Sequence, residues 1–296
     1  DPSGLAREVA EAINAPVDLH STKHFDVFHT MNGPWAEDAA SVLESLYASY
    51  FAAAVQAGFA VRDPDQPLAW LCFNSDESFR TYGALFEGET EFPFDSYFSS
   101  YSDRIILLLP GGMSSDRFTA TRVAHEAAHQ LAYNTGLQTR GVHYPLWISE
   151  GLATAFENVL AAGLPFAADN PYRRRALAAA RDNGLLLPLS DLVVATEVPA
   201  DTEQRNAIYA QAWGLVHFLY EHKPGALRQY LALLAQYDAG RRPEAALRME
   251  FEVAFGDPAD IQSDWSGFLA ALGGNEITAG IAHATPAVGT ATALAD

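Results

Sequence analysis

The chain has 296 residues, of which 49% are hydrophobic and 11% aromatic, so it can bury a substantial core, and an intrinsically disordered protein is excluded. Its formal net charge of −19 argues against binding to nucleic acids, because a phosphate backbone is bound by a basic surface. The sequence has no run of about 18 apolar residues, which argues against a membrane-spanning helix.

The N-terminal sequence and the cysteine content bear on the compartment. The chain begins with "DPSGLAREVA", which has neither a Met nor an apolar signal core, and Cys72 is its single cysteine. It can form no intrachain disulfide, which fits both the cytosol and a disulfide-free exported protein. We favour an extracytoplasmic location, secreted or periplasmic with the signal peptide removed, over a cytoplasmic one. Cys72 lies in the apolar run "LAWLCF" and is predicted to be a buried structural thiol. The oligomeric state is not predicted.

The first part of the chain, residues 1–113, alternates between helical and strand patterns and is predicted to form a mixed α/β layer. The strand at 24–30 shows period-2 alternation, and the strand at 67–73 has the continuous apolar run of a buried strand. Ser75 or Asp76 is the expected N-cap of the third helix. The predicted helices span residues 3–15, 35–58 and 75–85, and the predicted strands span 24–30, 67–73 and 104–110.

The second part of the chain, residues 114–272, is predicted to be mostly helical, because strand patterns become rare after "GGMSSDRF". The two parts together predict an α+β fold. The remaining residues, 273–296, are rich in Ala and Thr and offer little to pack. We expect this tail to be poorly ordered or loosely docked and to carry no chemistry.

The sequence "HEAAHQ", residues 125–130, lies in a predicted helix over residues 114–136. His125 and His129 are one helical turn apart on the same face, so both imidazoles can reach one metal ion. Glu126 lies about 100° around the helix, close enough to contact a water molecule on that ion. The alternative is an ordinary helix with two exposed histidines or two histidines satisfied in the core.

A third metal ligand is available on the next predicted helix, residues 145–163, where Glu150 lies near the start. Twenty residues separate His129 from Glu150, which is enough for a loop and a return to the same place. Two histidines, one glutamate and an open position form the ligand set of a catalytic zinc site. We therefore expect one Zn²⁺ per chain.

The two motifs together, "HEAAHQ" and "WISEGLATAFE", strongly resemble the gluzincin zinc metallopeptidases of the peptidase MA-like superfamily. The stretch W-x-x-E-G-x-A looks like the third-ligand motif of the aminopeptidase branch, although that branch's G-A-M-E-N type exopeptidase motif is absent. The chain is similar in particular to a bacterial family catalogued as a domain of unknown function. The likeness covers residues 117 to about 160, and "IYAQAWGLVHFL" at 208–219 is also similar.

This resemblance implies a thermolysin-like catalytic core with an edge strand beside the active site. It implies that His125, His129 and Glu150 bind zinc and that Glu126 is the general base. The strand at 104–110, which precedes the first zinc helix, would then be the edge on which an extended peptide substrate lies. A core strand without a substrate role is the alternative.

Two further residues receive roles from the resemblance. Glu157, seven residues after Glu150, would orient a metal-bound histidine, and an ordinary solvated glutamate is the alternative. Tyr209 would be the hydrogen-bond donor to the oxyanion, and the alternative is a packed tyrosine with its hydroxyl on a backbone carbonyl. His143 and Tyr144 are expected to have a surface loop role rather than to contact substrate. The basic segment "YRRRALAAAR", residues 172–181, is predicted to be a solvated helix face.

The resulting prediction is a zinc-dependent peptidase that hydrolyses peptide bonds with a Glu-activated, zinc-bound water. Its partner would be a peptide or protein substrate, and no nucleic acid. The alternative is a gluzincin-like, zinc-containing binding or scaffolding protein without peptidase turnover.

Overall fold

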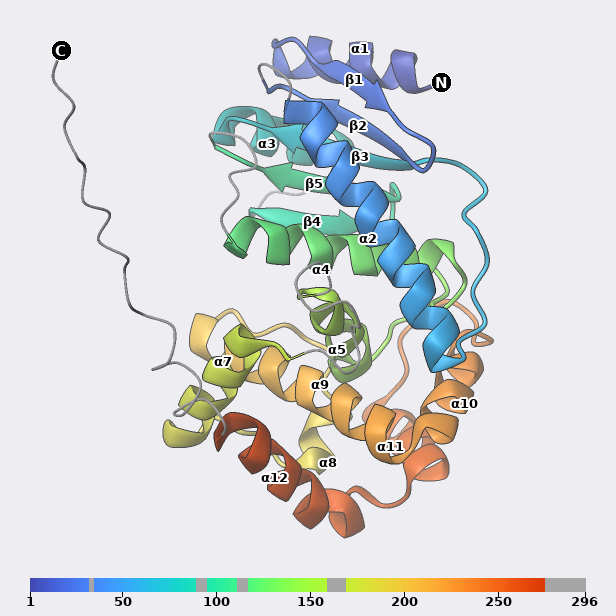
Figure 1. The fold of residues 1–296 in the computed structure, drawn as a ribbon, viewed down its shortest axis with the longest axis vertical. Helices are drawn as coiled ribbons and strands as arrows, with labels where there is room; N and C mark the ends of the chain where they lie inside the picture. Colours follow the sequence, from blue (N-terminus) through green and yellow to red (C-terminus); the bar gives the residue numbers. More distant parts are fainter. Residues whose placement is uncertain (32–34, 89–94, 111–116, 159–168, 275–296) are drawn as a thin grey trace, which may run out of the picture.

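The computed structural model describes residues 1–31, 35–88, 95–110, 117–158 and 169–274. Within these residues a five-stranded mixed sheet at the N-terminal end is followed by a mostly helical part, which confirms the predicted fold class (Figure 1). The predicted tail begins at residue 273, but the last helix continues to Gly274. The rest of the tail lies outside the described residues.

The sheet has the strand order β1-β2-β3-β5-β4. The three inner strands are parallel to one another, and the two outer strands are antiparallel to their neighbours. The inner strands correspond to the three predicted ones, whereas the short, more polar outer strands were not predicted. The strands are β1 (Asp18–Ser21), β2 (Phe25–His29), β3 (Leu68–Phe73), β4 (Ser96–Ser99) and β5 (Arg104–Leu108).

Helices cover the sheet on both faces. On one face, α1 (Pro2–Ile13) and α3 (Asp76–Tyr82) pack on the strands through residues such as Val9 and Phe79. Helix α2 (Trp35–Ala57) crosses the other face (Figure 1). All five residues of β2 are therefore buried, in place of the predicted alternation. The N-cap of α3 is Ser75, whose hydroxyl accepts a hydrogen bond from the backbone N–H of Ser78, and a short π-helical segment, Gly83–Glu87, follows the helix.

The strand predicted at 104–110 is present as β5, but its predicted position at the edge of the sheet is wrong. β5 lies between β3 and β4, and its central residues Ile105 and Ile106 are fully buried on opposite faces of the sheet. The core-strand alternative is therefore the right one. The two edge strands of the sheet are β1 and β4, and β4 is the one that runs beside α4 (Arg117–Asn134) (Figure 1). A strand that is apolar on both faces must be covered on both faces, and such a strand belongs in the middle of a sheet.

The helical part packs around α5 (Leu146–Phe156), which lies between α4 and α9 (Thr202–His222) (Figure 1). Gly151 allows the close approach of α5 and α9, because a Cβ there would lie 2.6 Å from the Ala212 carbonyl oxygen and from a Val216 methyl group. Gly151, which directly follows Glu150, thus allows the position of the helix that carries Glu150. The other helices are α7 (Pro171–Asp182), α8 (Leu189–Leu192), α10 (Pro224–Leu234), α11 (Glu244–Phe255) and α12 (Pro258–Gly274).

One hydrophobic core joins the two predicted parts of the chain, since Trp70 and Leu107 of the sheet belong to the same cluster as Val123, Leu152 and Leu215 of the helices. Cys72 is buried in this core, as predicted, and burial raises the pKa of its thiol, so it is unsuited to act as a nucleophile. Across the described part of the chain, none of the helices combines the length and the apolar character needed to cross a membrane.

Candidate metal centre

The two histidines of "HEAAHQ" and Glu150 meet where α4 crosses α5. The Nε2 atoms of His125 and His129 are 3.2 Å apart. Glu150 Oε2 is 3.2 Å from His125 Nε2 and 3.5 Å from His129 Nε2. The side chains of all three residues are 11–12% exposed, so the group is largely shielded from bulk water.

The spacing of these three donor atoms fits a metal ion. Ligands at about 2.0–2.1 Å from a tetrahedral zinc ion lie about 3.3–3.4 Å from one another, since a tetrahedron's edge is about 1.6 times its centre-to-corner distance. The three observed separations, 3.2, 3.2 and 3.5 Å, lie just below and just above this range. His125, His129 and Glu150 can therefore hold a metal ion, and within the described residues they form the group with metal-ligand geometry.

The charges around His125 also favour a cation at this place. Glu150 Oε2 is buried and accepts no hydrogen bond from the described residues. Burial alone would lower the pKa of His125, but the carboxylates of Glu150 and Glu157 outweigh burial and raise the pKa to about 10. A site that attracts a proton so strongly also attracts a metal ion, because both compete for the same lone pairs.

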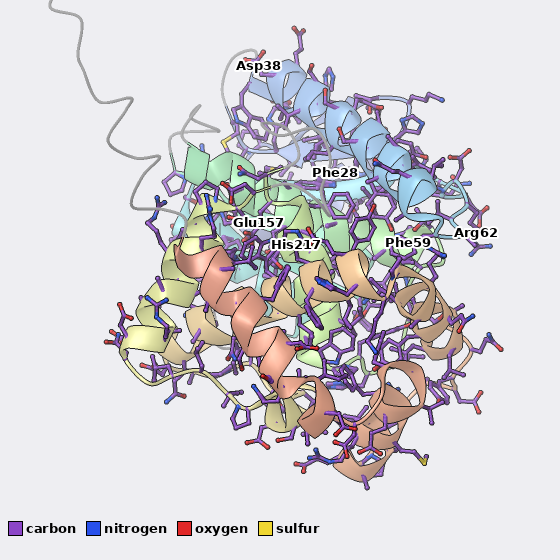
Figure 2. The ribbon with its side chains drawn as sticks, turned by 60° about the horizontal axis from the view of Figure 1, so that its bottom comes forward. Phe28, Asp38, Phe59, Arg62, Glu157 and His217 are labelled. Carbon is purple, nitrogen blue, oxygen red and sulfur yellow. The ribbon has the colours of Figure 1, made fainter. Side chains whose placement is uncertain are left out.

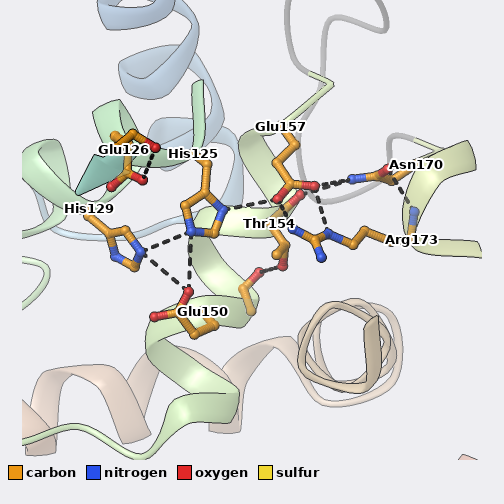
Figure 3. A network of polar contacts seen from close by, with 10 residues as sticks. His125, Glu126, His129, Glu150, Thr154, Glu157, Asn170 and Arg173 are labelled. Atoms are coloured by element: carbon orange, nitrogen blue, oxygen red, sulfur yellow. Dashed lines mark hydrogen bonds and ion pairs between the residues drawn. The ribbon is translucent and has the colours of Figure 1, made fainter. Parts of the chain in front are cut away.

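Glu157 lies on the far side of the His125 ring, where its Oε1 is 3.0 Å from Nδ1 (Figure 3). Burial would raise the pKa of Glu157, but the adjacent Arg173 and His125 lower it to about 2, so the carboxylate is ionised and only accepts hydrogen bonds. Nδ1 of His125 therefore carries the proton, and in the neutral ring the lone pair is on Nε2, which faces Glu150 and His129. This is the position expected of a carboxylate that orients a metal-binding histidine.

Glu157 is itself held by Arg173 and Asn170, which sequence reasoning missed. Arg173 Nε donates to Glu157 Oε2 at 2.8 Å, Arg173 Nη2 donates to Oε1, and Asn170 Nδ2 donates to Oε2 at 2.9 Å. The Glu157 side chain is 2% exposed and lies inside the molecule, whereas the charged Asp38 and Arg62 lie at its surface (Figure 2). The solvated alternative for Glu157 is therefore not what the structure shows.

The predicted solvated face at 172–181 is wrong for Arg173, which is buried. Leu177 and Ala180, which follow Arg173 by four and seven residues, are the other buried residues of this helix, so their spacing was a signal that Arg173 is the arginine that faces inward. A signal for the helix start was present: Asn170 is followed by Pro171, and Asn170 Oδ1 caps α7 by accepting from the backbone N–H of Arg173.

Glu126 is buried beside the histidines but is not one of the three clustered donors. Its Oε1 accepts a hydrogen bond of 3.1 Å from the hydroxyl of Ser96, at the start of the edge strand β4. No sequence pattern singled out Ser96, because the short strand β4 was not predicted. This bond fixes the carboxylate between α4 and the edge of the sheet.

Tyr209 reaches the same site from α9. Its ring is nearly parallel to that of His125, with 15° between the planes and 6.1 Å between the centroids. The guanidinium carbon of Arg173 lies 5.4 Å from the centre of the Tyr209 ring. Burial, and then the carboxylates of Glu150 and Glu126, raise the pKa of Tyr209. Its hydroxyl makes no hydrogen bond with another described residue, so the backbone-bonded alternative is not seen.

These residues border a cavity of about 590 Å³. Strand β4, helices α4, α5, α7 and the first turns of α9 all contribute to its lining. His143 and Tyr144 do not line it. Tyr144 is instead buried, and its hydroxyl accepts a hydrogen bond of 2.8 Å from the backbone N–H of Thr139. The expected surface loop role is therefore wrong for Tyr144, which has a structural role within its loop.

Part of the chain matches a known family. Residues 119–239 match a family described as "Protein of unknown function (DUF1570)". The matched segment contains both histidines, Glu126, Glu150, Glu157, Arg173 and Tyr209. No curated protein matches the chain.

Proposed function

We propose that the protein is a zinc-dependent peptidase, similar to the gluzincins, that hydrolyses peptide bonds. The observation that carries this proposal is the trio of His125, His129 and Glu150, with donor atoms at metal-ligand spacing on one side of an open cavity. Two histidines and a carboxylate suit zinc, and they leave a coordination position free for chemistry. When bound, a zinc ion would activate water for attack and polarise the carbonyl of the scissile bond.

The residues around the trio supply the remaining functions. Glu126, which lines the cavity, would take the proton of the attacking water and pass it to the leaving nitrogen. The Tyr209 hydroxyl would donate a hydrogen bond to the oxygen on which negative charge develops. Glu157 would keep Nδ1 of His125 protonated and the ring fixed in place.

The open edge of β4 supports a peptide as substrate. The backbone N–H of Leu108 donates to the carbonyl of Asp95 at 2.7 Å, and bonded and non-bonded pairs alternate along an antiparallel ladder. Ser96 and Phe98 therefore direct their backbone N–H and C=O groups away from β5, towards an edge that no described strand covers. Both residues line the cavity. An extended peptide can pair with this edge as an additional strand beside Glu126.

The purified protein is expected to contain about one zinc ion per chain. Glu150→Ala removes the anionic ligand and should lower zinc occupancy sharply, as measured by elemental analysis and by competition with a chromophoric chelator. Glu126→Gln is the matched control, since it removes a neighbouring buried carboxylate that is not a ligand. Full zinc content and unchanged affinity in Glu150→Ala would show that Glu150 is not the third ligand.

Peptidase activity is tested with a mixed peptide library. We expect the zinc-loaded protein to cleave a subset of the peptides, the cleavage to stop with a chelator, and added zinc to restore it. Mass spectrometry of the products gives the cleaved bonds. A protein that holds stoichiometric zinc and binds peptides but releases no products would instead be the zinc-containing binding or scaffolding protein considered above.

A further inference from the structure

Two aromatic side chains, Phe98 of β4 and Tyr133 of α4, form one wall of the cavity. Their rings are stacked, with 5.5 Å between the centroids and 23° between the planes. Both side chains line the cavity, and both are partly buried and pack against the main hydrophobic core. The core therefore holds each ring in place, while part of each ring borders the cavity.

Tyr133 is also held by a third aromatic ring. The ring of Tyr144 meets it edge-on, with 6.3 Å between the centroids and 80° between the planes. The Tyr144 hydroxyl is fixed in turn by the hydrogen bond from the backbone N–H of Thr139. Burial, and then the nearby Tyr144 and Glu150, raise the pKa of Tyr133 to about 12, so its hydroxyl stays protonated at neutral pH. The aromatic wall is therefore preformed and uncharged.

The aromatic wall lies directly beside the candidate metal centre. On α4, Tyr133 follows His129 by four residues, so it lies about 6 Å further along the same face of the helix. On β4, Phe98 follows Ser96 by two residues, so both side chains are on one face of the sheet, about 7 Å apart. Ser96 contacts Glu126, whereas Phe98 contacts the tyrosine. Strand and helix thus run together from the proposed general base to the aromatic wall.

A peptide on the open edge of β4 would place one of its side chains on this wall. Ser96 and Phe98 both direct backbone groups towards the edge, so an added strand has one residue opposite each of them. Side chains of residues that lie opposite each other in neighbouring strands are on the same face, about 5 Å apart. The substrate residue opposite Ser96 therefore lies near Glu126. The substrate residue two positions along lies against Phe98 and Tyr133, and the residue between them points to the other face.

We propose that Phe98 and Tyr133 form a subsite for a large apolar side chain, aromatic above all, two positions along the substrate from the residue beside Glu126. Such a side chain loses its contact with water when it lies on the wall, and an aromatic ring adds offset or edge-on contacts with the two rings. This inference rests on the proposed peptidase function and on the pairing of the substrate with β4.

The test starts from one peptide with blocked termini that the zinc-loaded protein cleaves. Each residue within three positions of the cleaved bond is replaced in turn by Phe, Leu or Ser, and kcat/KM is measured for every peptide. We expect one position at which Phe exceeds Ser about tenfold or more, with Leu between them, and much smaller ratios at the two adjacent positions. Equal ratios at all positions would overturn the subsite, since they would reflect a general preference for apolar peptides.

Variants of the wall test which residues form the subsite. Phe98→Ala and Tyr133→Ala should each lower the Phe-to-Ser ratio several-fold, whereas Tyr133→Phe keeps the ring and should keep the ratio. Tyr172→Ala is the matched control, because Tyr172 lines the cavity from α7 and its removal should leave the ratio unchanged. Both rates of a ratio come from one preparation, so a partial loss of folded protein cancels. A preference for Phe that survives in Phe98→Ala and in Tyr133→Ala would overturn the assignment.

Binding separates failure of this inference from failure of the peptidase. Fluorescence anisotropy with the zinc-loaded Glu126→Gln variant measures the affinity of labelled, blocked peptides of Thr and Ser, with or without one central Phe. Tighter binding of the Phe peptide that is lost when Phe98→Ala is added, with no cleavage of any peptide by the unaltered protein, would support the subsite and refute the peptidase. Cleavage of peptides by the unaltered protein, with equal affinity for both labelled peptides, would support the peptidase and overturn the subsite.

Discussion

Glu126→Gln is expected to lower the rate of peptide hydrolysis by at least about 10²-fold while zinc stays bound. The amide has the size of the carboxylate and can still accept a hydrogen bond from Ser96, which lies 3.1 Å from Oε1. It cannot accept the proton of the attacking water, because an amide is not a base at neutral pH. The effect should fall on kcat, since Glu126 is outside the ligand trio and the open strand edge is unaltered.

Rates and zinc content are to be measured on the same preparations. Glu87→Gln is a suitable control, because Glu87 is a partly buried carboxylate that accepts hydrogen bonds from the hydroxyls of Ser99 and Ser102 but does not line the cavity. It should keep both zinc and activity. A Glu126→Gln protein as active as the unaltered one would rule out the proposed mechanism.

The proximity of the two histidines, which are candidate metal ligands, could be predicted because helix geometry determines it locally. Four residues make about one turn, so His125 and His129 share a face in any helical context. The position of Glu150 depends in addition on a second helix that comes back beside the first. The adjacent Gly151 explains why this helix can lie where it does. A side chain at position 151 would collide with the Ala212 carbonyl, so α5 and α9 come close enough to place Glu150 only with glycine at that position.

The seven-residue offset between Glu150 and Glu157 correctly indicated a shared helix face, but not what lies between them. Seven residues span about 10 Å along a helix. The His125 ring fills this gap, with Nε2 near Glu150 and Nδ1 near Glu157. This bridging depends on how α4 crosses α5, a tertiary feature that no local pattern records.

The edge strand of the sheet and the residues of the cavity wall could not be predicted from local sequence patterns, for a related reason. Which strand lies at an edge depends on the strand order, and the polar strand β4 is too short for its periodicity to be recognised. Likewise, Arg173, Arg174 and Arg175 are chemically identical in the sequence. The helical phase marked by Leu177 turns Arg173 inward, but the pairing of Arg173 with Glu157, the pairing of Arg174 with Asp169 and the position of Arg175 at the cavity depend on how the chain packs around α7.

In the proposed mechanism, Tyr209 would act on the reacting carbonyl. It lines the cavity, its ring is nearly parallel to that of His125, and the guanidinium of Arg173 lies over the ring. The hydroxyl keeps its proton at neutral pH, because burial and the nearby carboxylates of Glu150 and Glu126 raise its pKa. With no hydrogen bond to another described residue, it is available to donate to a substrate oxygen. A hydrogen bond from such a donor stabilises the oxygen most when negative charge develops on it.

Tyr209→Phe removes only this hydroxyl and leaves the ring and its packing. We expect the variant to keep its fold and zinc but to lose about 10²-fold or more in kcat, with little change in KM, because the hydrogen bond forms mainly in the transition state. Tyr172→Phe is the matched control: Tyr172 also lines the cavity but is 38% exposed, and its loss of a hydroxyl should leave kcat nearly unaltered. Steady-state kinetics on both variants, with zinc content measured alongside, distinguishes the roles. An unchanged kcat in Tyr209→Phe would mean that Tyr209 only packs against His125, and that the oxyanion is stabilised by another group.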